Sequence, residues 1–263
     1  MIFLNTSDEI ELLRQANLLV GKTLAEVAKI IEPGVTTKQL DKVAEEFIRD
    51  NGAIPTFKGY PNYDGSPFPG SICASVNDVV VHGIPNDVPL KEGDIISVDC
   101  GTFLNGFCGD SCYTFCVGEV DEETKKLLQV TKESLYKGIE QAVHGKRLGD
   151  IGNAVQTHCE QNGFGVVREF VGHGIGREMH EEPQVPNYGR RGNGMLLKNG
   201  LCIAIEPMIT QGKRDIAMLQ DNWTIVTRDK KFAAHFEHTV CVRKGKADIL
   251  SSFEEIENVL RCK

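Results

Sequence analysis

An asparagine-glycine pair between two β-rich runs is the feature that most constrains how this chain can fold. The pair, Asn105-Gly106, lies inside residues 98–114 and is the strongest short signal for a hairpin with a two-residue turn. Such a turn fixes the pairing register, so Gly101 is expected to face Asp110 across the hairpin. Asp99 and Asp110 then lie diagonally on one face, with Cβ atoms ~7–8 Å apart at most.

The residues just before Asp99 indicate that this face is buried, because Ile95-Ile96-Ser97-Val98 is mostly aliphatic. Two carboxylates on a buried face cannot stay ionised unless something positive compensates them. Gly101 leaves a gap opposite Asp110, so one cation, or two, could lie between the aspartates. The alternative interpretation is that both aspartates are exposed beside the turn.

Composition and charge limit the kinds of partner that this chain can bind. The 263 residues are 41% hydrophobic, enough for a substantial core, and the formal net charge of −8 argues against nucleic acid. The pair Arg190-Arg191 is too small to form a basic patch and is interpreted as a solvated loop. No basic, apolar leader opens the chain, and no apolar stretch approaches the ~20 residues of a membrane span. We therefore expect a cytoplasmic protein that binds no membrane.

Nine cysteines without a CxxC pair do not resemble a disulfide framework or a structural zinc site, so they are expected to be free thiols. Cys108, Cys112 and Cys116 share strand parity with Asp110, which leaves a thiolate metal site open. Small buried apolar residues are the favoured interpretation, since free cysteine is among the most buried residue types.

Two helices are expected at the start of the chain. Thr6-Ser7-Asp8-Glu9 is a capping box, and the apolar residues after it keep a helical period until Pro33-Gly34. Thr36 and Gln39 open a second amphipathic helix, which stops at Asn51-Gly52.

The same pattern returns 111 residues later. A helical run from about Asp121 to Val143 stops at Gly145, and a second run stops at Asn162-Gly163. Matching stops at one offset predict an α+β fold of two similar halves, about 1–118 and 119–263. In each half a helix pair is expected to pack on antiparallel strands.

Two histidines lie at the ends of predicted strands. His82 ends a short buried strand within residues 77–85, where a structural role and a functional role are equally open. His173 lies between two glycines within residues 170–176, so only backbone crowds its imidazole. The glycines could serve a tight turn, but the histidine has no role in a turn, which favours a ligand. His180 follows seven residues later.

Two glutamates lie in the remaining strands. Residues 201–207 form an apolar strand that ends in Glu206, because the proline after it cannot continue as an inner strand. Residues 224–227 and 232–242 are predicted to pair as a final hairpin, whose second strand carries Glu237. A short last helix is expected at about 252–260.

The predicted strands supply four carboxylates and one imidazole. Four carboxylates carry a charge of −4, which two divalent cations neutralise, whereas one cation would leave −2 in a low-dielectric interior. A two-metal site is the consistent solution, and oxygen-rich ligation suits Mn, Co, Fe or Zn. Paired ions ~3.5–4 Å apart activate a shared water for hydrolysis. The five side chains are Asp99, Asp110, His173, Glu206 and Glu237.

Seven short motifs in order and spacing carry a resemblance to a known family. The sequence resembles the type I methionine aminopeptidases, of the pita-bread fold, over essentially its whole length. Each motif alone is weak, but seven in order are specific. They are Val81-His82-Gly83-Ile84-Pro85, Asp99-Cys100-Gly101, Gly109-Asp110, Gly172-His173-Gly174-Ile175-Gly176, His180-Glu181-Glu182-Pro183, Ile205-Glu206-Pro207-Met208 and Glu237-His238-Thr239.

The resemblance implies roles for these residues in a single catalytic metallopeptidase domain. The five side chains named above would be the ligands of two divalent ions, with Asp99 bidentate and Asp110 and Glu237 bridging. Glu206 would accept the proton of the attacking water. His180 would donate to the developing oxyanion, and His82 would hold the peptide nitrogen of the next residue.

The resemblance also implies a substrate pocket and partners. The substrates would be N-terminal methionyl peptides and nascent chains with a small second residue, cleaved by a monomer. Residues 61–66 lengthen one loop beside the pocket, and Phe57 replaces a cysteine found in some members. The proposed lining for an unbranched thioether is Tyr60, Phe68, Cys73, Met179 and Trp223.

Two alternatives belong to the same fold. One is a proline-directed relative, a prolidase or aminopeptidase P, which usually carries an additional N-terminal domain. The other is a non-catalytic pita-bread protein that binds polypeptide or RNA and has lost ligands. All five ligand-type residues are present here, and the acidic charge disfavours RNA.

Overall fold

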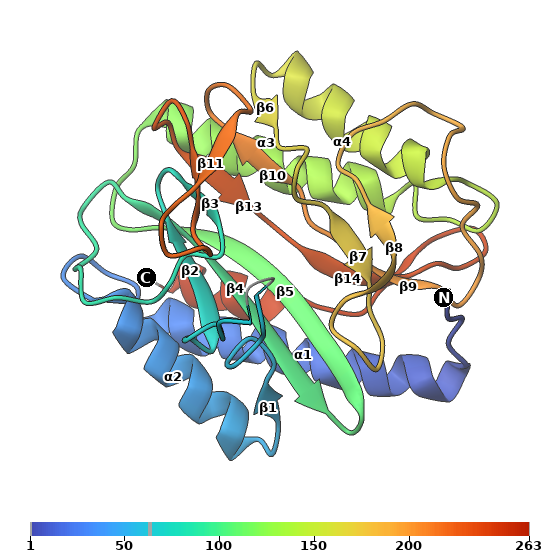
Figure 1. Cartoon of the computed structure of the whole chain (residues 1–263), viewed down its shortest axis with the longest axis horizontal. Helices are drawn as coiled ribbons and strands as arrows, with labels where there is room; N and C mark the ends of the chain where they lie inside the picture. The colour runs from blue at the N-terminus through green and yellow to red at the C-terminus, as the bar shows by residue number, and fades with distance from the viewer. Residues whose placement is uncertain (1, 63–64, 263) are drawn as a thin grey trace.

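The computed structural model describes residues 2–62 and 65–262 as an α+β arrangement of helices and short strands (Figure 1). The helices are α1 (Ser7–Ile30), α2 (Thr37–Asp50), α3 (Glu122–Ile139), α4 (Leu148–Gln161) and α5 (Glu254–Arg261). The strands are β1 (Ile54–Pro55), β2 (Ile72–Val76), β3 (Val79–Val81), β4 (Ile95–Leu104), β5 (Phe107–Cys116), β6 (Gly165–Val166), β7 (Gly172–Gly174), β8 (Glu181–Val185), β9 (Cys202–Ile205), β10 (Met208–Thr210), β11 (Ile216–Met218), β12 (Ile225–Thr227), β13 (Ala233–His235), β14 (His238–Cys241) and β15 (Asp248–Ile249).

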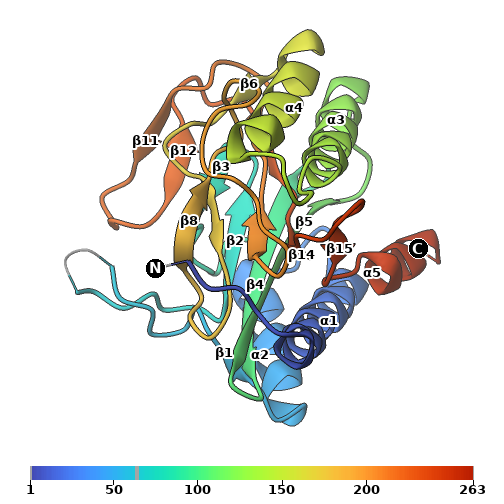
Figure 2. The ribbon, with the colours of Figure 1, turned by 90° about the vertical axis from the view of Figure 1, so that its right-hand side faces the viewer.

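The helices are arranged in two pairs with strands between them. In Figure 1, α1 and α2 lie below the strands and α3 and α4 lie above them. Helix α1 packs on β4 and β5, and α3 packs on α4 and on β9, β10 and β13. Figure 2 shows α1, α3 and α5 on one side of the strands, with β8, β11 and β12 toward the other side. The strand face turned away from the helices is therefore free to carry a site.

The predicted hairpin register is confirmed. Strands β4 and β5 pair antiparallel, with Leu104 opposite Phe107 and Gly101 opposite Asp110. Asn105 and Gly106 have φ values of 52° and 86°, which is the left-handed conformation that both loop residues of a type I′ turn require. Because a one-residue slip would turn every side chain to the opposite face, this local signal fixes where both aspartates point.

The helix starts follow their capping signals. The Glu9 backbone N–H donates to the Thr6 hydroxyl, and the Thr6 N–H donates to the Glu9 carboxylate, which completes a capping box. Thr36 and Gln39 form the same reciprocal pair at α2. Capping residues therefore determine where both helices begin.

The third helix ends earlier than its periodicity predicts. We expected it to run to about Val143, but α3 ends at Ile139. Val143 forms a β-bridge with Arg243 instead, and the His144 N–H donates to the Arg243 carbonyl at 2.9 Å. The apolar run continues through these residues because they make a tertiary contact. The helical period of the sequence looks the same whether such residues form another helical turn or this contact.

The final hairpin was predicted with the wrong partners. Strand β12 pairs with β11 and β3, whereas β13 pairs with β10 and β14 pairs with β9 and β15. The run 232–242 is broken at Glu237, whose N–H donates to the Cys112 carbonyl at 2.9 Å and whose carbonyl accepts from the Ser111 hydroxyl at 2.8 Å. Hydrogen bonds to β5 thus replace the ladder that a continuous strand would have formed.

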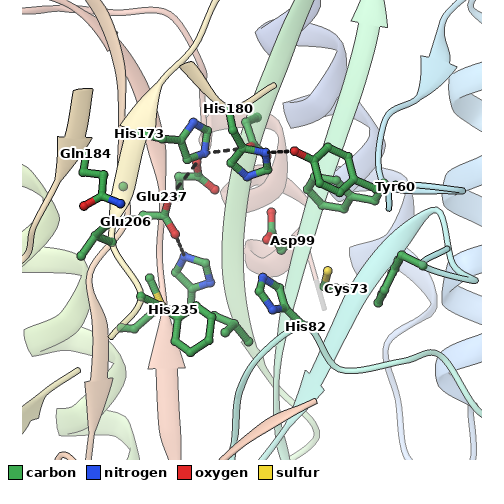
Figure 3. A pocket seen from close by; sticks show the side chains of 18 of the residues that line it. Tyr60, Cys73, His82, Asp99, His173, His180, Gln184, Glu206, His235 and Glu237 are labelled. Carbon is green, nitrogen blue, oxygen red and sulfur yellow. Dashed lines mark hydrogen bonds and ion pairs between the residues drawn. The ribbon is translucent and has the colours of Figure 1, made fainter. Parts of the chain in front are cut away.

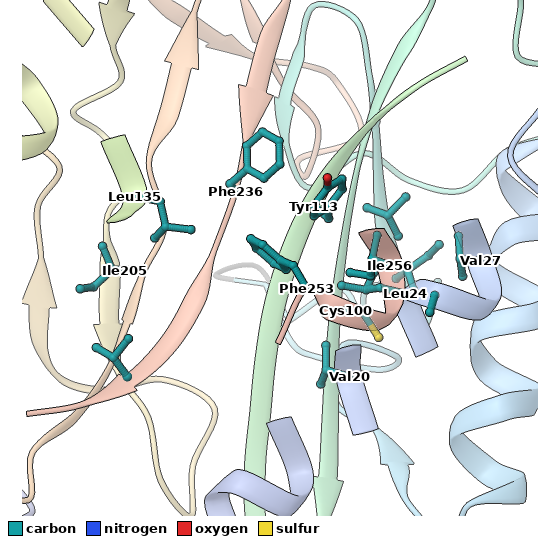
Figure 4. Close-up of a cluster of buried hydrophobic side chains, with 14 of the residues drawn as sticks. Val20, Leu24, Val27, Cys100, Tyr113, Leu135, Ile205, Phe236, Phe253 and Ile256 are labelled. Carbon is teal, nitrogen blue, oxygen red and sulfur yellow. The ribbon is translucent and has the colours of Figure 1, made fainter. Parts of the chain in front are cut away.

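One apolar cluster joins the N-terminal helices to strands from both parts of the chain (Figure 4). Its aromatic centre is Tyr113, whose ring centroid lies 4.9 Å from each of the rings of Phe115, Phe236 and Phe253. Phe236 directly precedes Glu237, so burial of this phenylalanine anchors the segment that presents the carboxylate. The apolar core therefore fixes the position of Glu237 through its buried neighbour Phe236.

Helices in the described part of the chain are too short or too polar to cross a membrane.

Candidate metal centre

A cavity of about 600 Å³ opens on the strand face and is surrounded by carboxylates and imidazoles (Figure 3). Among its described lining residues are seven carboxylates and no lysine or arginine. Such a site cannot neutralise its own negative charge. The acidic residues are Asp99, Asp110, Glu169, Glu181, Glu182, Glu206 and Glu237.

The two aspartates of the hairpin lie together in this cavity, as their register predicts. Burial raises the pKa of Asp110 to about 8, and burial together with the charge of Asp110 raises the pKa of Asp99 well above its usual range. One buried oxygen of each carboxylate has no hydrogen-bond partner among the described groups. Buried, unpartnered carboxylate oxygens are costly unless a cation compensates them.

His173 is held with one ring nitrogen directed at the carboxylates. Its Nδ1 donates to the Gly174 carbonyl at 2.9 Å, so the lone pair of the ring is on Nε2. The Nε2 atom lies 3.6 Å from Asp110 Oδ2 and 3.6 Å from Glu206 Oε1. The glycines beside it are needed for close strand approach, because a Cβ on Gly172 would overlap the Ala204 carbonyl of β9. A backbone-held Nδ1–H is the usual arrangement of a metal-binding histidine.

Glu206 and Glu237 come from neighbouring strands. Ile205 of β9 faces His238 of β14, so the two glutamates follow and precede this pair on opposite strands. Burial raises the pKa of both carboxyls well above the usual range, and their carboxylate neighbours add to the shift. Ligand atoms of Asp110, His173 and Glu237 lie within 4.8 Å of one another.

One imidazole in the site had no predicted role. His235 Nε2 is buried, has no hydrogen-bond partner among the described groups, and lies 3.6 Å from Glu206 Oε2. Burial lowers the pKa of His235 to about 3, so the ring is neutral and adds no positive charge. Its position two residues before Glu237 was the available signal, since alternate residues of an extended segment share a face.

These observations fit divalent metal ions. The donor set combines carboxylate oxygens with an oriented imidazole nitrogen, and three of the buried carboxylates have an oxygen without any described partner. Such a donor set suits a first-row divalent metal. The five predicted ligand-type residues all line the one cavity.

Metal-free protein is expected to lose stability as pH rises from about 6.5 to 8. Below that window the buried histidines oppose the trend, because their lowered pKa values favour folding as pH rises toward the unfolded value near 6.5. Within the window the unfolded histidines lose their remaining protons, which offsets part of the loss. Asp110, with a pKa of about 8 in the folded state and 3.8 ordinarily, keeps a proton that the unfolded chain has released, and burial raises the pKa of Asp99, Glu206 and Glu237 in the same direction. The loss is ~2 kcal/mol from Asp110, or roughly 4–8 °C in melting temperature.

Thermal melts of metal-free protein at pH 6.5 and pH 8 measure this slope, and metal-loaded protein is the control. Asp110→Asn should flatten it, since the amide does not titrate. A metal-free melting temperature that stays constant or rises across this window would contradict the expectation.

Two further histidines face the cavity from opposite sides. Burial lowers the pKa of His82 and of His180 to about 4, and in each case a second imidazole adds to the effect. His82 follows β3 with φ 58°, a conformation uncommon for residues other than glycine. His180 Nδ1 lies 2.7 Å from the Tyr60 hydroxyl. Both rings are therefore neutral near pH 7 and able to donate one proton.

The predicted pocket residues divide into two groups. Tyr60, Phe68, Cys73 and Trp223 line the cavity, and the Phe68 and Trp223 rings meet edge to face with centroids 5.1 Å apart. Met179 is buried but is not among the described lining residues.

Met179 instead occupies the gap over Gly101, where a Cβ would lie 2.5 Å from its terminal methyl carbon. The gap that we expected a cation to use is therefore partly filled by this side chain. Tyr63 and Asp64, in the lengthened loop 61–66, lie outside the described residues.

The cysteines of β5 do not gather at the metal cluster. Cys112 Sγ lies 3.5 Å from the His235 carbonyl and Cys108 Sγ lies 3.6 Å from the Arg177 carbonyl, while Cys116 is exposed. All nine cysteines are free. Cys108 and Cys112 behave as small buried residues, which the sequence favoured over thiolate ligation.

Known proteins match this chain over nearly all of its length. Residues 11–244 match the model of metallopeptidase family M24. "Methionine aminopeptidase 1" of Bacillus subtilis (strain 168) is 51% identical over 251 residues, which cover 95% of this chain and 99% of the relative. The chain belongs to the methionine aminopeptidases of metallopeptidase family M24. The resemblance to the type I methionine aminopeptidases is thereby confirmed.

Solved methionine aminopeptidase structures share the fold. The crystal structure of methionine aminopeptidase from Rickettsia prowazekii superposes with a TM-score of 0.92 at 43% identity, covering 96% of this chain and all of that one. The predicted pita-bread fold is confirmed. A prolidase from Pyrococcus furiosus has a TM-score of 0.74 at 20% identity, and this chain covers 65% of it. That likeness shows the fold alone, whereas the Bacillus subtilis methionine aminopeptidase matches this chain at 51% identity.

Proposed function

We propose that this metallopeptidase removes the N-terminal methionine from peptides that carry a small second residue. The observation that carries the proposal is one cavity that joins an unneutralised cluster of carboxylates and imidazole to an aromatic and thiol-lined pocket. Hydrolysis of a peptide bond needs the first part, and recognition of a thioether side chain needs the second. The relatives at about half identity are named for methionine removal.

The metal-binding role belongs to Asp99, Asp110, His173, Glu206 and Glu237. Their burial, their lack of any neighbouring cationic side chain in the cavity and the unpartnered carboxylate oxygens support this assignment. Bound divalent ions would supply an activated water and polarisation of the scissile carbonyl. Glu237 is held by backbone hydrogen bonds to β5, so its carboxylate is fixed beside that of Asp110.

Glu206 accepts the proton of the attacking water and passes it to the leaving amine. Burial raises the pKa of Glu206 first, which supports this role because it favours the protonated form that the carboxylate reaches when it takes the proton. His173 Nε2 and His235 Nε2 lie 3.6 Å from its two oxygens and restrict its position. A carboxylate held in this way can alternate between accepting and donating one proton.

His180 donates a hydrogen bond to the developing oxyanion. The Tyr60 hydroxyl, 2.7 Å from Nδ1, supports this role, because a hydroxyl that donates to Nδ1 leaves the ring proton on Nε2. A donor already aligned before reaction stabilises the oxyanion without reorganisation. His82 lies across the cavity beside Phe170 and Trp223 and holds the peptide nitrogen of the next residue.

The side-chain pocket favours an unbranched thioether. Sulfur gains ~0.3–1.5 kcal/mol from each aromatic contact, and Tyr60, Phe68 and Trp223 offer such contacts beside Cys73. A branched leucine side chain fills the same slot less well. Two further carboxylates that line the cavity, Glu181 and Glu182, would attract the free ammonium group of the substrate.

A panel of tripeptides is expected to separate these features. Met-Ala-Ser should be cleaved at least ~10-fold faster in kcat/KM than Leu-Ala-Ser, because hydrophobic pockets discriminate small shape changes by 10–200-fold. N-acetylated Met-Ala-Ser, which lacks the ammonium group, serves as the control and should not be cleaved. Equal rates for leucine and methionine would contradict a thioether pocket. Preference for Leu-Pro-Ser would favour a proline-directed enzyme.

We further infer how the chain works in the cell. Nascent polypeptides are its natural substrates, in the cytoplasm, where nine free thiols are compatible with a reducing environment. It acts as a monomer, since exposed apolar side chains such as Leu18, Ile54 and Met218 lie on separate elements. The halves about 1–118 and 119–263 form one catalytic domain because each supplies part of the ligand set.

A further inference from the structure

Two cysteines face each other in the ladder that ends at the metal centre. Cys202 of β9 is the partner of Cys241 of β14, and among the described strand pairs this is the position where one thiol meets another. Both residues are buried. Opposite residues in an antiparallel pair point to the same face, so the two sulfurs are neighbours.

The backbone hydrogen bonds show which kind of pair this is. The Val242 N–H donates to the Leu201 carbonyl at 2.8 Å, so the neighbouring pair 201/242 is the hydrogen-bonded one. On β14, the Thr239 carbonyl accepts from Leu250 at 2.9 Å, which confirms that alternate residues of this strand bond away from β9. Cys202 and Cys241 therefore form a non-hydrogen-bonded pair.

That geometry suits a disulfide. Non-hydrogen-bonded pairs have Cα atoms ~4.5 Å apart and side chains closer than in hydrogen-bonded pairs. Disulfides need Cα separations of ~4.4–6.8 Å. The two backbones thus already lie at a separation that the bond can span, and the strands need not move apart or slide.

The chemistry of the pair suits oxidation. A hydrogen bond from Cys202 lowers the pKa of the Cys241 thiol, and Arg243 adds to the effect while burial opposes it. A thiolate beside a cation is the reactive form of cysteine. The Asn5 side chain contacts Cys202, and the Asn5 N–H donates to the Gly200 carbonyl at 2.8 Å. Residues 2–4 before it are exposed, so the segment in contact with Cys202 lies at the surface, where local opening would admit a small oxidant.

We propose that Cys202 and Cys241 are a redox modification site that takes a peroxide as oxidant and closes an internal disulfide. The Cys241 sulfur attacks one peroxide oxygen, which yields a sulfenic acid and one water. The Cys202 sulfur then displaces the hydroxyl group as a second water, and the S–S bond forms. Two thiols are oxidised and one hydrogen peroxide is reduced. A dithiol reductant reverses the change.

The bond would tie together the two strands that present metal-centre carboxylates. Glu206 lies four residues after Cys202, and Glu237 lies four residues before Cys241. The cross-link closes a loop of about 40 residues that includes β10 to β13, and loops of this size restrict the unfolded chain strongly. Oxidised protein is expected to melt ~5–10 °C higher than reduced protein.

Peptide mapping after treatment with hydrogen peroxide tests the proposal on the intact chain. Trypsin should release residues 199–213 and 232–243, each of which contains a single cysteine. Without reductant these peptides should appear joined, with a mass two hydrogens below their sum, and a dithiol should separate them. Absence of the joined peptide at a dose that oxidises the exposed Cys116 and Cys262 would overturn the proposal.

Serine variants provide matched controls. Cys202→Ser and Cys241→Ser should each lose the joined peptide and the rise in melting temperature on oxidation. Cys159→Ser, at a buried thiol of α4 in a different apolar cluster, should keep both. Each variant is compared with itself before and after peroxide, so a loss of basal stability does not affect the result. A rise on oxidation that persists in Cys202→Ser would also overturn the proposal.

Discussion

Removal of divalent metal is expected to abolish peptidase activity, and its return to restore it. Seven carboxylates line the cavity without a lysine or arginine among its described residues, so no cationic side chain is placed to activate the attacking water in place of the metal. Dialysis against a chelator, followed by metal analysis and a Met-Ala-Ser assay, measures both states. Up to two ions should rebind per chain, because two divalent charges balance four ligand carboxylates.

Mock dialysis without chelator is the control for loss of activity through handling. Mn, Co, Fe and Zn should be returned separately, since the donor set accepts each of them. Full turnover in a sample verified to be metal-free would show that the carboxylate cluster has another purpose. Asp110→Asn and Glu237→Gln should lower both metal content and rate, whereas a loss of rate at full occupancy would contradict their role as ligands.

His180→Ala is expected to lower kcat by ~10²–10³ while metal content stays at the wild-type value. One oxyanion donor is usually worth this much, and His180 reaches the cavity from the segment before β8 without being part of the Asp110, His173 and Glu237 cluster. The ring is neutral near pH 7 because burial lowers its pKa to about 4. In the proposed role it would therefore act as a neutral hydrogen-bond donor and not as a cation.

Tyr60→Phe and His144→Ala make this test specific. Without the Tyr60 hydroxyl, nothing holds the His180 proton on Nε2. We therefore expect kcat to fall less in Tyr60→Phe than in His180→Ala, with metal retained. His144 is exposed and is not among the described residues that line the cavity, so its substitution should leave kcat unchanged. Unchanged kcat in His180→Ala, or a fall explained fully by lost metal, would show that the donor is a different group.

The candidate site was largely predictable because its residues carry local signals. Asp99 and Asp110 are placed by one two-residue turn, and the turn depends only on what Asn105 and Gly106 can adopt. Glu206 ends an apolar strand at a proline. A carboxylate at such a position is conspicuous in sequence because burial without compensation would be costly.

His235 and Met179 could not be assigned in the same way. A histidine in an apolar run could equally be a buried residue with all its hydrogen bonds made. The contact between His235 and Glu206 depends on β13 pairing with β10 and ending at His235, which the sequence does not show. Met179 is apolar and flexible, so it can fill whichever gap the fold leaves. It fills the space over Gly101 rather than appearing among the described cavity lining.

The sequence by itself determined the helix starts, the central hairpin and its register, the ligand-type residues and the family. The helix starts and the hairpin depend on interactions within a few residues, such as a cap or a left-handed turn, whose energies do not need the rest of the chain. The ligand-type residues and the family were indicated by short motifs in a fixed order along the chain. Tertiary structure alone decided the partners of β12, β13 and β14 and the early end of α3. Strands that are far apart in the sequence could pair in several ways that bury similar apolar faces. The periodicity of the sequence does not show which of these pairings has the lowest free energy.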